Sequence, residues 1–455
     1  MNSSMRGNSN MHDTIGSTKR SGGAFPWRRA ASAVAFAASA FPFASLACLA
    51  PAPAAAADVV ITSENKGAES ISLGFIDFIC AKGDAKTIPF TPGGVISWDL
   101  EFSGRFKVRA ASRFDSTSKG EFKADGALAY VRGEYTLEGD NFTLNCELID
   151  IDTQERILGK KYSGKKGELR QSAHKFSDEL TYQLFGEKGI AQSRIAYVNK
   201  RGGHKEISVM DYDGANVTEI TKNKSINLMP CWVEGKSKIL YTSYAGGQPQ
   251  FYLKDFESGK NAVLFASKGM NTSPGWNKMD KEIVYASTMD GNTEIYRRPF
   301  PEGKAQRLTF FGSIETSPSW SPNGYEIVFI SDRGGKPMVY VMDRDGSNMR
   351  ALTHDGDYFG SPSWSPKGDR IAYTAMDEGN NMNIMTISPD GKDPAKLTAG
   401  SGSNENPSWS PDGRHIVFMS TRTGSPEIFM MNADGSDQKR ISFSGGNYMP
   451  RWSDY

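Results

Sequence analysis

Histidine and acidic side chains are the groups of this chain that could carry catalysis or hold a metal ion. Beyond residue 57 there are four histidines, each distant from the others in sequence: His174, His204, His354 and His415. The sequence contains neither a Gly-x-Ser-x-Gly nucleophile motif nor a His-Glu-x-x-His zinc motif. These absences argue against a serine hydrolase and a zincin protease. Surface or packing roles are the simpler interpretation of the histidines.

Short acidic turns recur along the second half of the chain. They read Asp211-Tyr-Asp-Gly, Asp343-Arg-Asp-Gly and Asn432-Ala-Asp-Gly. Each resembles the start of a calcium-binding loop but lacks the later Asp, Asn and Glu ligands. We therefore interpret them as β-turns that position strands. The sequence predicts no catalytic residue, no cofactor and no metal site.

Length and composition indicate the kind of fold that holds the histidine and acidic residues in place. The 455 residues exceed one ordinary domain, and 53 Lys and Arg against 52 Asp and Glu give a net charge of +1. This balance disfavours nucleic acid and anionic membranes as partners. With 47 Gly and 22 Pro flanking short apolar runs, the chain is expected to contain many turns and mainly β-structure.

A Pro-x-Trp motif repeats six times and predicts the architecture. The spacings between successive tryptophans are 44, 44, 44, 45 and 43 residues, the length of one four-stranded propeller blade. No amphipathic helical period occurs within a unit. The tryptophans are expected to be core anchors: Trp232, Trp276, Trp320, Trp364, Trp409 and Trp452.

The two ends of the repeat region complete each other. The first unit begins at Arg194 without a Pro-x-Trp strand, and the last Pro-x-Trp is followed only by Ser453 to Tyr455. If Tyr448 to Trp452 supplies the innermost strand of the first blade, six whole blades result and no sheet edge is left at the seam. The predicted fold is therefore mainly β: a six-bladed β-propeller over 194–455, preceded by a small α/β sandwich domain.

The α/β domain is expected over residues 58–186, with a linker over 187–193. Its expected elements are strands at 70–78 and 106–109, a helix at 92–102, a hairpin of 127–137 and 141–151, a strand at 156–163 and a helix at 168–185. Cys80 and Cys146 could form a disulfide in this domain, but free buried thiols explain them equally well, and Cys231 lies in a repeat position.

Residues 1–57 are typical of a secretory signal. Two arginines precede an Ala-rich apolar stretch over residues 30–50, and small residues follow up to Ala57. We predict cleavage near residue 57, before Asp58, and export into an oxidising compartment. A retained membrane anchor and a lipid anchor on Cys48 are the alternatives.

Loop lengths predict which end of the propeller binds partners. In a four-stranded antiparallel blade, the first-to-second and third-to-fourth connections share one face and are tight turns here. The blade-to-blade connections lie on the opposite face and are longer and more varied. We expect the binding surface on that opposite face, in these segments: 223–229, 267–273, 310–317, 354–361, 399–406 and 444–449.

Several features together resemble the TolB family of periplasmic propeller proteins. They are the six Pro-x-Trp units, their Trp-Ser-Pro turns, the Leu-Thr pairs at 308–309, 352–353 and 397–398, the preceding α/β domain and the export signal. The resemblance implies a non-catalytic periplasmic adaptor of the Tol-Pal system that supports outer-membrane integrity during cell division. Its implied partners are the peptidoglycan-associated lipoprotein Pal and TolA, with outer-membrane lipoproteins and colicins as further candidates. The membrane would be reached only through such partners.

The resemblance also implies contact residues. By motif register, the Pal-facing positions are Met270, Ser273, Glu315, Thr316 and Ser317. Family members have His in place of Met270 and Glu in place of Ser317, and Glu315 is a nearby acidic substitute for the latter. The implied TolA-binding strand consists of Asp58, Val59, Val60, Ile61, Thr62 and Ser63.

Two other classes of function stay open. A metal-dependent lactonase or cyclase would need acidic or histidine ligands converging from the innermost strands. Those strands read Met-Pro-Cys, Ser-Pro-Gly, Ser-Pro-Ser and Asn-Pro-Ser, which is poor in ligands. A glycan-binding propeller would use exposed aromatic residues on the loop side, for which Tyr358, Phe359 and Tyr448 are the candidates.

Overall fold

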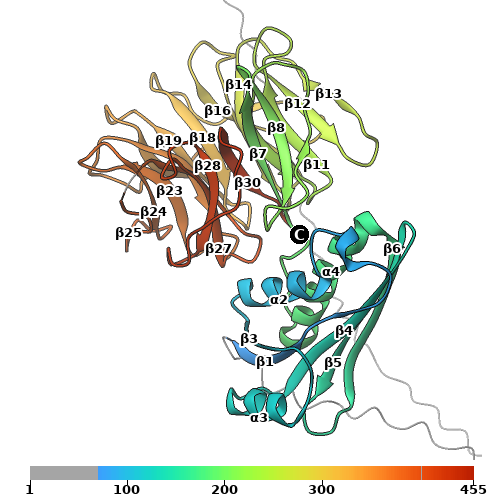
Figure 1. Cartoon of the computed structure of the whole chain (residues 1–455). Helices are drawn as coiled ribbons and strands as arrows, with labels where there is room; N and C mark the ends of the chain where they lie inside the picture. The colour runs from blue at the N-terminus through green and yellow to red at the C-terminus, as the bar shows by residue number, and fades with distance from the viewer. Residues whose placement is uncertain (1–69, 401) are drawn as a thin grey trace, which may run out of the picture. The chain divides into compact units, whose positions relative to one another are not determined.

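A computed structural model of the chain describes residues 70–400 and 402–455 (Figure 1). The predicted export signal over 1–57 and the predicted TolA-binding strand Asp58–Ser63 lie outside these ranges. Within the described residues, no helix is long and apolar enough to cross a membrane.

The α/β domain is a mixed sheet covered by two helices. Its elements are β1 (Ile71–Ile76), β2 (Ile79–Lys82), the 3-10 helix η1 (Ala85–Thr87), α2 (Pro92–Phe102), β3 (Phe106–Ala111), α3 (Ser116–Ala124), β4 (Ala129–Glu138), β5 (Asn141–Asp150), β6 (Arg156–Lys165), the 3-10 helix η2 (Lys166–Glu168) and α4 (Leu169–Phe185). The strand order is β3-β1-β4-β5-β6, with β2 paired to β4. Strand β1 runs parallel to β3 and β4, whereas β4, β5 and β6 are antiparallel.

Local sequence explains where the two covering helices begin and end. Thr91 caps α2 by accepting a hydrogen bond from the Gly94 amide at 3.1 Å, and Pro92 occupies the first helical turn. Helix α4 ends at Gly186, whose φ of 71° is left-handed. Apolar residues of both helices, among them Leu100 and Phe176, pack in one core with the sheet. The cysteines of the described residues, Cys80, Cys146 and Cys231, are free thiols.

The propeller has six four-stranded antiparallel blades (Figure 1). Blade 1 contains β7 (Arg194–Arg201), β8 (His204–Asp211), β9 (Thr218–Glu219) and β30 (Asn447–Trp452). Blade 2 contains β10 (Asn227–Val233), β11 (Lys238–Ser243), β12 (Gln250–Asp255) and β13 (Asn261–Phe265). Blade 3 contains β14 (Asn271–Asn277), β15 (Glu282–Ser287), β16 (Glu294–Pro299) and β17 (Gln306–Arg307).

The remaining three blades follow the same plan. Blade 4 contains β18 (Glu315–Trp320), β19 (Glu326–Ser331), β20 (Met338–Asp343) and β21 (Arg350–Ala351). Blade 5 contains β22 (Phe359–Trp364), β23 (Ile371–Met376), β24 (Met382–Ile387) and β25 (Ala395–Lys396). Blade 6 contains β26 (Asn404–Trp409), β27 (His415–Ser420), β28 (Glu427–Asn432) and β29 (Lys439–Arg440).

The C-terminal strand closes the propeller, as the sequence predicts. Strand β30 pairs antiparallel with β7, with Tyr448 opposite Val198 and Trp452 opposite Ile195. The Trp452 indole also donates a 2.8 Å hydrogen bond to the Ser193 hydroxyl. Chain segments about 250 residues apart therefore share one sheet, and β7 keeps no unpaired edge because β30 pairs with it.

Every innermost strand carries the same β-bulge. The residue before the proline of each Pro-x-Trp has a left-handed φ between 48° and 58°, and the pairing register with the second strand shifts there. Since a non-glycine residue in this region costs about 1 kcal/mol, its recurrence in all six blades shows that the fold imposes it. We call these residues the bulge ring: Met229, Ser273, Ser317, Ser361, Asn406 and Met449.

The propeller and the α/β domain share a hydrophobic core at the segment that joins them. Phe102 of α2 packs with Tyr212 and Trp452 of blade 1. In the predicted linker over 187–193, Ile190 and Ala191 are buried in the same cluster. Asp178 of α4 accepts hydrogen bonds from the backbone amides of this segment. The segment is therefore packed against its neighbours rather than free.

Candidate functional site

The blade-to-blade connections share one end of the propeller with the second-to-third strand connections, because adjacent strands in each blade are antiparallel. We call this end the loop face and the opposite end, with its tight turns, the turn face. The blade-to-blade connections run over residues 220–226, 266–270, 308–314, 352–358, 397–403 and 441–446. Residue 401 of the fifth connection lies outside the described residues.

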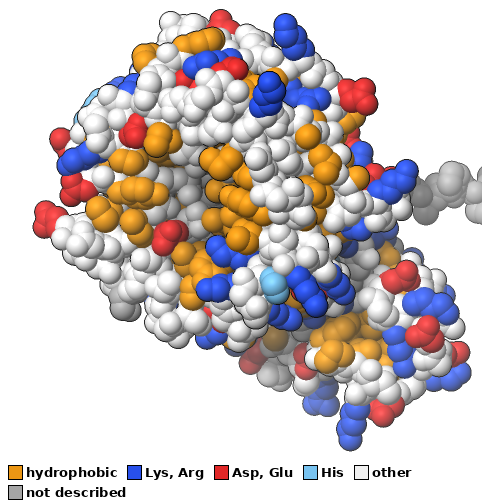
Figure 2. Space-filling view, turned by 90° about the horizontal axis from the view of Figure 1, so that it is seen from above, with side chains coloured by type: hydrophobic (Ala, Val, Ile, Leu, Met, Phe, Trp, Pro, Cys, Tyr) orange, Lys and Arg blue, Asp and Glu red, His pale blue; other side chains and the backbone are white. Residues whose placement is uncertain are grey.

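Large apolar side chains are exposed on the loop face. Phe310 is 71% exposed and Phe443 is 74% exposed. The exposed large hydrophobic residues of the blade-to-blade connections are Ile226, Met270, Phe310, Phe311, Ile314, Tyr358 and Phe443. Several groups of hydrophobic side chains are also visible on the face of the molecule that Figure 2 shows. Concentrations of exposed apolar residues are typical of surfaces that bind other proteins.

Arginine side chains hold two of these phenyl rings in place. The Arg307 guanidinium lies 4.8 Å from the centre of the Phe310 ring, and Arg440 lies at the same 4.8 Å from Phe443. Each arginine also forms an ion pair of 2.6 Å with a fully buried glutamate, Glu294 or Glu427. The Arg-x-x-Phe spacing shared by the two blades is the sequence signal that could have identified them.

Glu315 does not occupy the surface position expected of a partner contact. Its side chain is fully buried, and its carboxylate accepts hydrogen bonds from the hydroxyls of Ser313 and Ser331. Arg333 forms an ion pair with it at 3.2 Å and lies 3.9 Å from the centre of the Phe311 ring. Glu315 therefore supports the connection from inside, and we do not carry it forward as a direct contact.

Glu315 also departs from a pattern of side chains that meet between neighbouring blades. In each pair, one residue comes from the third strand of a blade and the other begins the innermost strand of the next blade. For example, the Asn227 amide donates a 2.9 Å hydrogen bond to the Glu206 carboxylate, and the Asn447 amide donates one of 2.7 Å to Glu427. The equivalent positions in blade order are Glu206 with Asn227, Gln250 with Asn271, Glu294 with Glu315, Met338 with Phe359, Asn383 with Asn404, and Glu427 with Asn447. One pair thus consists of two buried carboxyl groups.

Burial, reinforced by the neighbouring Glu294, raises the pKa of Glu315 above its usual value of 4.5. We expect Glu315→Asn to increase the free energy of unfolding by about 1 kcal/mol at pH 7, because one Glu315 carboxylate oxygen has no hydrogen-bond partner among the described residues. Since the folded protein holds the proton more tightly, the stabilising contribution of Glu315 is complete below pH 4.5 and falls as the pH rises through the folded pKa.

The gain from Glu315→Asn should therefore vanish near pH 4, which urea unfolding at pH 4 and pH 7 would measure. Asn447→Glu makes the reverse change at the Glu427–Asn447 pair and should lose stability as the pH rises. An equal gain from Glu315→Asn at both pH values would contradict this account.

The other predicted contact residues lie in two neighbouring blades. Met270 is 45% exposed in the connection that leads to β14, whereas Ser273 is buried in the bulge ring. Its hydroxyl donates a 3.2 Å hydrogen bond to the sulfur of Met229, the ring member of the preceding blade. Thr316 and Ser317 are partly exposed at the start of β18. The structure thus leaves Met270, Thr316 and Ser317 available at the surface.

The central channel offers little to a metal-dependent enzyme. Its lining includes the middle residue of each Pro-x-Trp, namely Cys231, Gly275, Ser319, Ser363, Ser408 and Arg451. Burial raises the pKa of the Cys231 thiol to about 11, so this thiol is protonated at neutral pH. The Arg451 guanidinium forms no ion pair with the described residues, and its charge opposes a cation here. Nothing in the sequence around Pro450 and Trp452 marks Arg451 as a charged residue of the channel.

The aromatic residues proposed for glycan binding are not presented together. Tyr358 is 39% exposed, but Phe359 is buried between blades 4 and 5. Tyr448 is partly buried and lies 5.8 Å from the Lys205 amino group. The expectation that Phe359 is a surface residue is wrong, because it begins an innermost strand and faces the core.

The histidines are not brought together. His174 lies on α4 and is buried where this helix packs against blade 1. His415 stacks on Phe102, with the two ring centres 4.1 Å apart. His204 is partly buried and His354 is exposed. Five tryptophans of the repeat are buried in the propeller core, and Trp276 is partly buried at its edge. The Trp409 indole donates a 3.1 Å hydrogen bond to the Ser363 carbonyl of the preceding blade.

Comparisons with known proteins agree on one family. A family model described as the TolB β-propeller domain matches residues 182–400 and 361–454. The chain is 40% identical over 155 residues to the Tol-Pal system protein TolB of Geobacter metallireducens, which covers 32% of this chain and 36% of that protein. It is 34% identical over 191 residues to a TolB homolog of Chlorobium chlorochromatii, covering 40% of this chain and 43% of that protein.

The alignments thus span well under half the length of these curated relatives. Among solved structures, TolB from Acinetobacter baumannii matches with a TM-score of 0.71 and 24% identity, over 85% of this chain and 97% of that chain. At this identity the match supports the fold, which includes the α/β domain as well as the propeller.

Proposed function

This chain belongs to the TolB β-propeller family, and we propose from this that it is a non-catalytic periplasmic adaptor of the Tol-Pal system. In this proposal the loop face binds the peptidoglycan-associated lipoprotein Pal. The segment Asp58–Ser63 binds TolA once the export signal over 1–57 has been removed. Through these contacts the protein maintains outer-membrane integrity during cell division. Colicins and outer-membrane lipoproteins are further candidate partners.

The observation that carries the proposal is the concentration of exposed apolar residues on the loop face. Met270 and Phe310 lie in consecutive blade-to-blade connections. Thr316 and Ser317 lie at the start of β18, the strand that follows the connection of Phe310. Large exposed apolar side chains on rigid scaffolds act as anchors that fill pockets of a partner. The arginine that holds Phe310 reduces the entropy lost when such an anchor is immobilised.

A double variant, Met270→Glu with Phe310→Glu, is expected to bind the soluble domain of Pal about 100-fold more weakly, because both anchors would become charged. Isothermal titration calorimetry on the purified proteins measures this change. The matched control is Met279→Glu with Tyr325→Glu, since these residues are 64% and 66% exposed on the turn face of the same two blades. The control should bind Pal as the unmodified protein does.

Equal binding by both double variants would remove the loop face from the proposal. If neither the unmodified protein nor the variants bind Pal, Pal is rejected as the partner. Ser273→Arg is unsuitable for this test, because Ser273 is buried and has a left-handed φ of 54°. Deletion of residues 58–63 should weaken binding to TolA and leave Pal binding to the loop face intact.

A further inference from the structure

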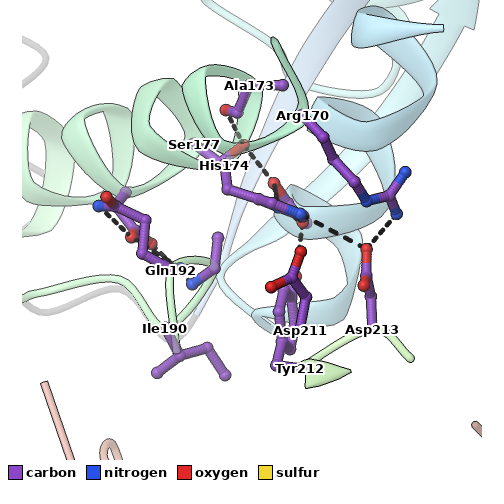
Figure 3. A network of polar contacts seen from close by, with 12 residues as sticks. Arg170, Ala173, His174, Ser177, Ile190, Gln192, Asp211, Tyr212 and Asp213 are labelled. Atoms are coloured by element: carbon purple, nitrogen blue, oxygen red, sulfur yellow. Dashed lines mark hydrogen bonds and ion pairs between the residues drawn. The ribbon is translucent and has the colours of Figure 1, made fainter. Parts of the chain in front are cut away.

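A polar cluster lies where helix α4 meets the turn between β8 and β9 (Figure 3). His174 of α4 points toward Asp211 and Asp213 of the Asp-Tyr-Asp-Gly turn. The side chains of His174 and Asp213 are only 3% and 4% exposed. Buried ionisable groups of this kind need a compensating charge or ligand.

The orientation of His174 leaves one ring nitrogen without a hydrogen bond. Its Nδ1 lies 2.9 Å from both carboxylate oxygens of Asp99 and donates its proton there. Asp99 is itself fixed by the hydroxyls of Ser177 at 2.7 Å and Tyr212 at 2.6 Å. The opposite nitrogen, Nε2, is buried without a hydrogen-bond partner among the described residues. A carboxylate behind the histidine is the usual arrangement for metal-binding imidazoles.

The separations between the candidate ligand atoms suit one metal ion. His174 Nε2 lies 3.5 Å from an Asp213 oxygen, too far for a good hydrogen bond. Two ligands on a tetrahedral ion with bonds of about 2.0 to 2.1 Å are expected about 3.3 Å apart. A ring nitrogen of His174 and one oxygen each from Asp211 and Asp213 all lie within 4.8 Å of one another, so small side-chain movements would bring the three ligand atoms onto one ion.

Charge and access favour a cation at the same point. The three carboxylates of Asp99, Asp211 and Asp213 are matched by one contacting guanidinium, that of Arg170, which forms an ion pair with Asp213. With a neutral imidazole, two negative charges stay unbalanced. A cavity of about 320 Å³, whose walls include His174, Asp211 and the more distant cations Arg194 and Lys236, leads to the cluster and can supply water.

We propose that His174, Asp211 and Asp213 bind one divalent transition-metal ion, for which zinc has the matching ligand preference, with a water molecule from the cavity as a fourth ligand. The ion would connect α4 of the α/β domain to blade 1. This site is independent of the loop face and of the proposed partners. No other Asp-x-Asp-Gly turn of the described residues has a histidine placed in this way.

Equilibrium dialysis of the full chain against Zn²⁺, followed by elemental analysis, tests the site. The protein should carry an affinity tag without histidine and be stripped with a chelator first. We expect one zinc ion per chain, and a loss of affinity of about tenfold or more in Asp211→Asn. Cobalt substituted for zinc should give the visible absorption of a tetrahedral nitrogen and oxygen site.

Asp343→Asn is the matched control. Asn348 donates a 2.7 Å hydrogen bond to Asp343, and Asn216 donates one of 2.6 Å to Asp211, so the two substitutions disturb the same kind of turn. The control should keep its zinc. His174→Ala should lose its zinc. If His174→Ala does not fold, the comparison of Asp211→Asn with Asp343→Asn tests the site instead. Absence of zinc binding in the unmodified protein, or equal binding in Asp211→Asn, would overturn the proposal and leave a network of ion pairs.

Discussion

Deletion of residues 448–455 is expected to abolish the cooperative unfolding of the propeller. The deletion removes nearly all of β30, which supplies the innermost strand of blade 1. It leaves β7 with an unpaired edge and removes the contact that joins the last blade to the first. The loss should approach the whole stability of an ordinary domain, about 5 kcal/mol or more.

The size of this effect follows from what β30 buries. Trp452 is 6% exposed and packs with Ile195 and Met430. Loss of a buried tryptophan side chain alone costs about 3 to 5 kcal/mol. The backbone hydrogen bonds between β30 and β7 are lost as well. The truncated chain should therefore melt broadly or aggregate.

Circular dichroism melting and gel filtration would measure the outcome. Deletion of Asp454 and Tyr455 alone is the control, because it spares β30 and removes only peripheral contacts, namely the Asp454–Lys278 ion pair and the contacts of Tyr455 with Lys188. That shorter deletion should melt within a few degrees of the full chain. A similar melting temperature for the longer deletion would show that the ring does not depend on its closing strand.

The repeated part of the fold could be predicted from the sequence because its signals recur. The Pro-x-Trp spacing gives the blade length six times, and the missing first strand and unpaired last strand indicate closure. Helix α3 gives no comparable signal. It buries only Ser118 and Phe122, so no apolar period marks it, and the capping box of Asp115 and Ser118 that starts it has no apolar run behind it.

The site could be predicted only in outline. Loop length predicts which end of the propeller carries the longer, more varied connections, but not which side chains are exposed there. Glu315 follows an exposed connection in sequence, yet the pleat turns it inward against Arg333, and no local pattern distinguishes it from the partly exposed Thr316 beside it. The pairing of Glu294 with Glu315 joins neighbouring blades and becomes visible only in three dimensions. The same holds for the approach of His174 to the turn at Asp211.

Arg333→Ala is expected to lower the free energy of unfolding by about 3 kcal/mol, because it leaves a fully buried carboxylate beside a second one. Arg422→Ala in blade 6 is the matched comparison. Arg422 occupies the equivalent position in its blade and donates a 2.8 Å hydrogen bond to the neutral side chain of Asn404. Both arginines lie over aromatic rings: Arg333 is 4.9 Å from the centre of the Tyr340 ring, and Arg422 is 4.8 Å from that of Phe429. Its loss should cost about 1 kcal/mol.

The difference between these two variants reports mainly on the charge of Glu315, since both lose a ring contact inside the blade and only Arg333 also loses a contact with a connection residue, Phe311. Without Arg333, the pKa of Glu315 should rise further, so the penalty should be largest at neutral pH and shrink as the pH falls toward 4.5, the usual value for this carboxyl. Adding Glu315→Asn to Arg333→Ala should restore most of the loss. Urea unfolding of the three variants would decide. Equal penalties for Arg333→Ala and Arg422→Ala, or a penalty independent of pH, would mean that the ion pair contributes little and that ring contacts alone hold the connection to β18.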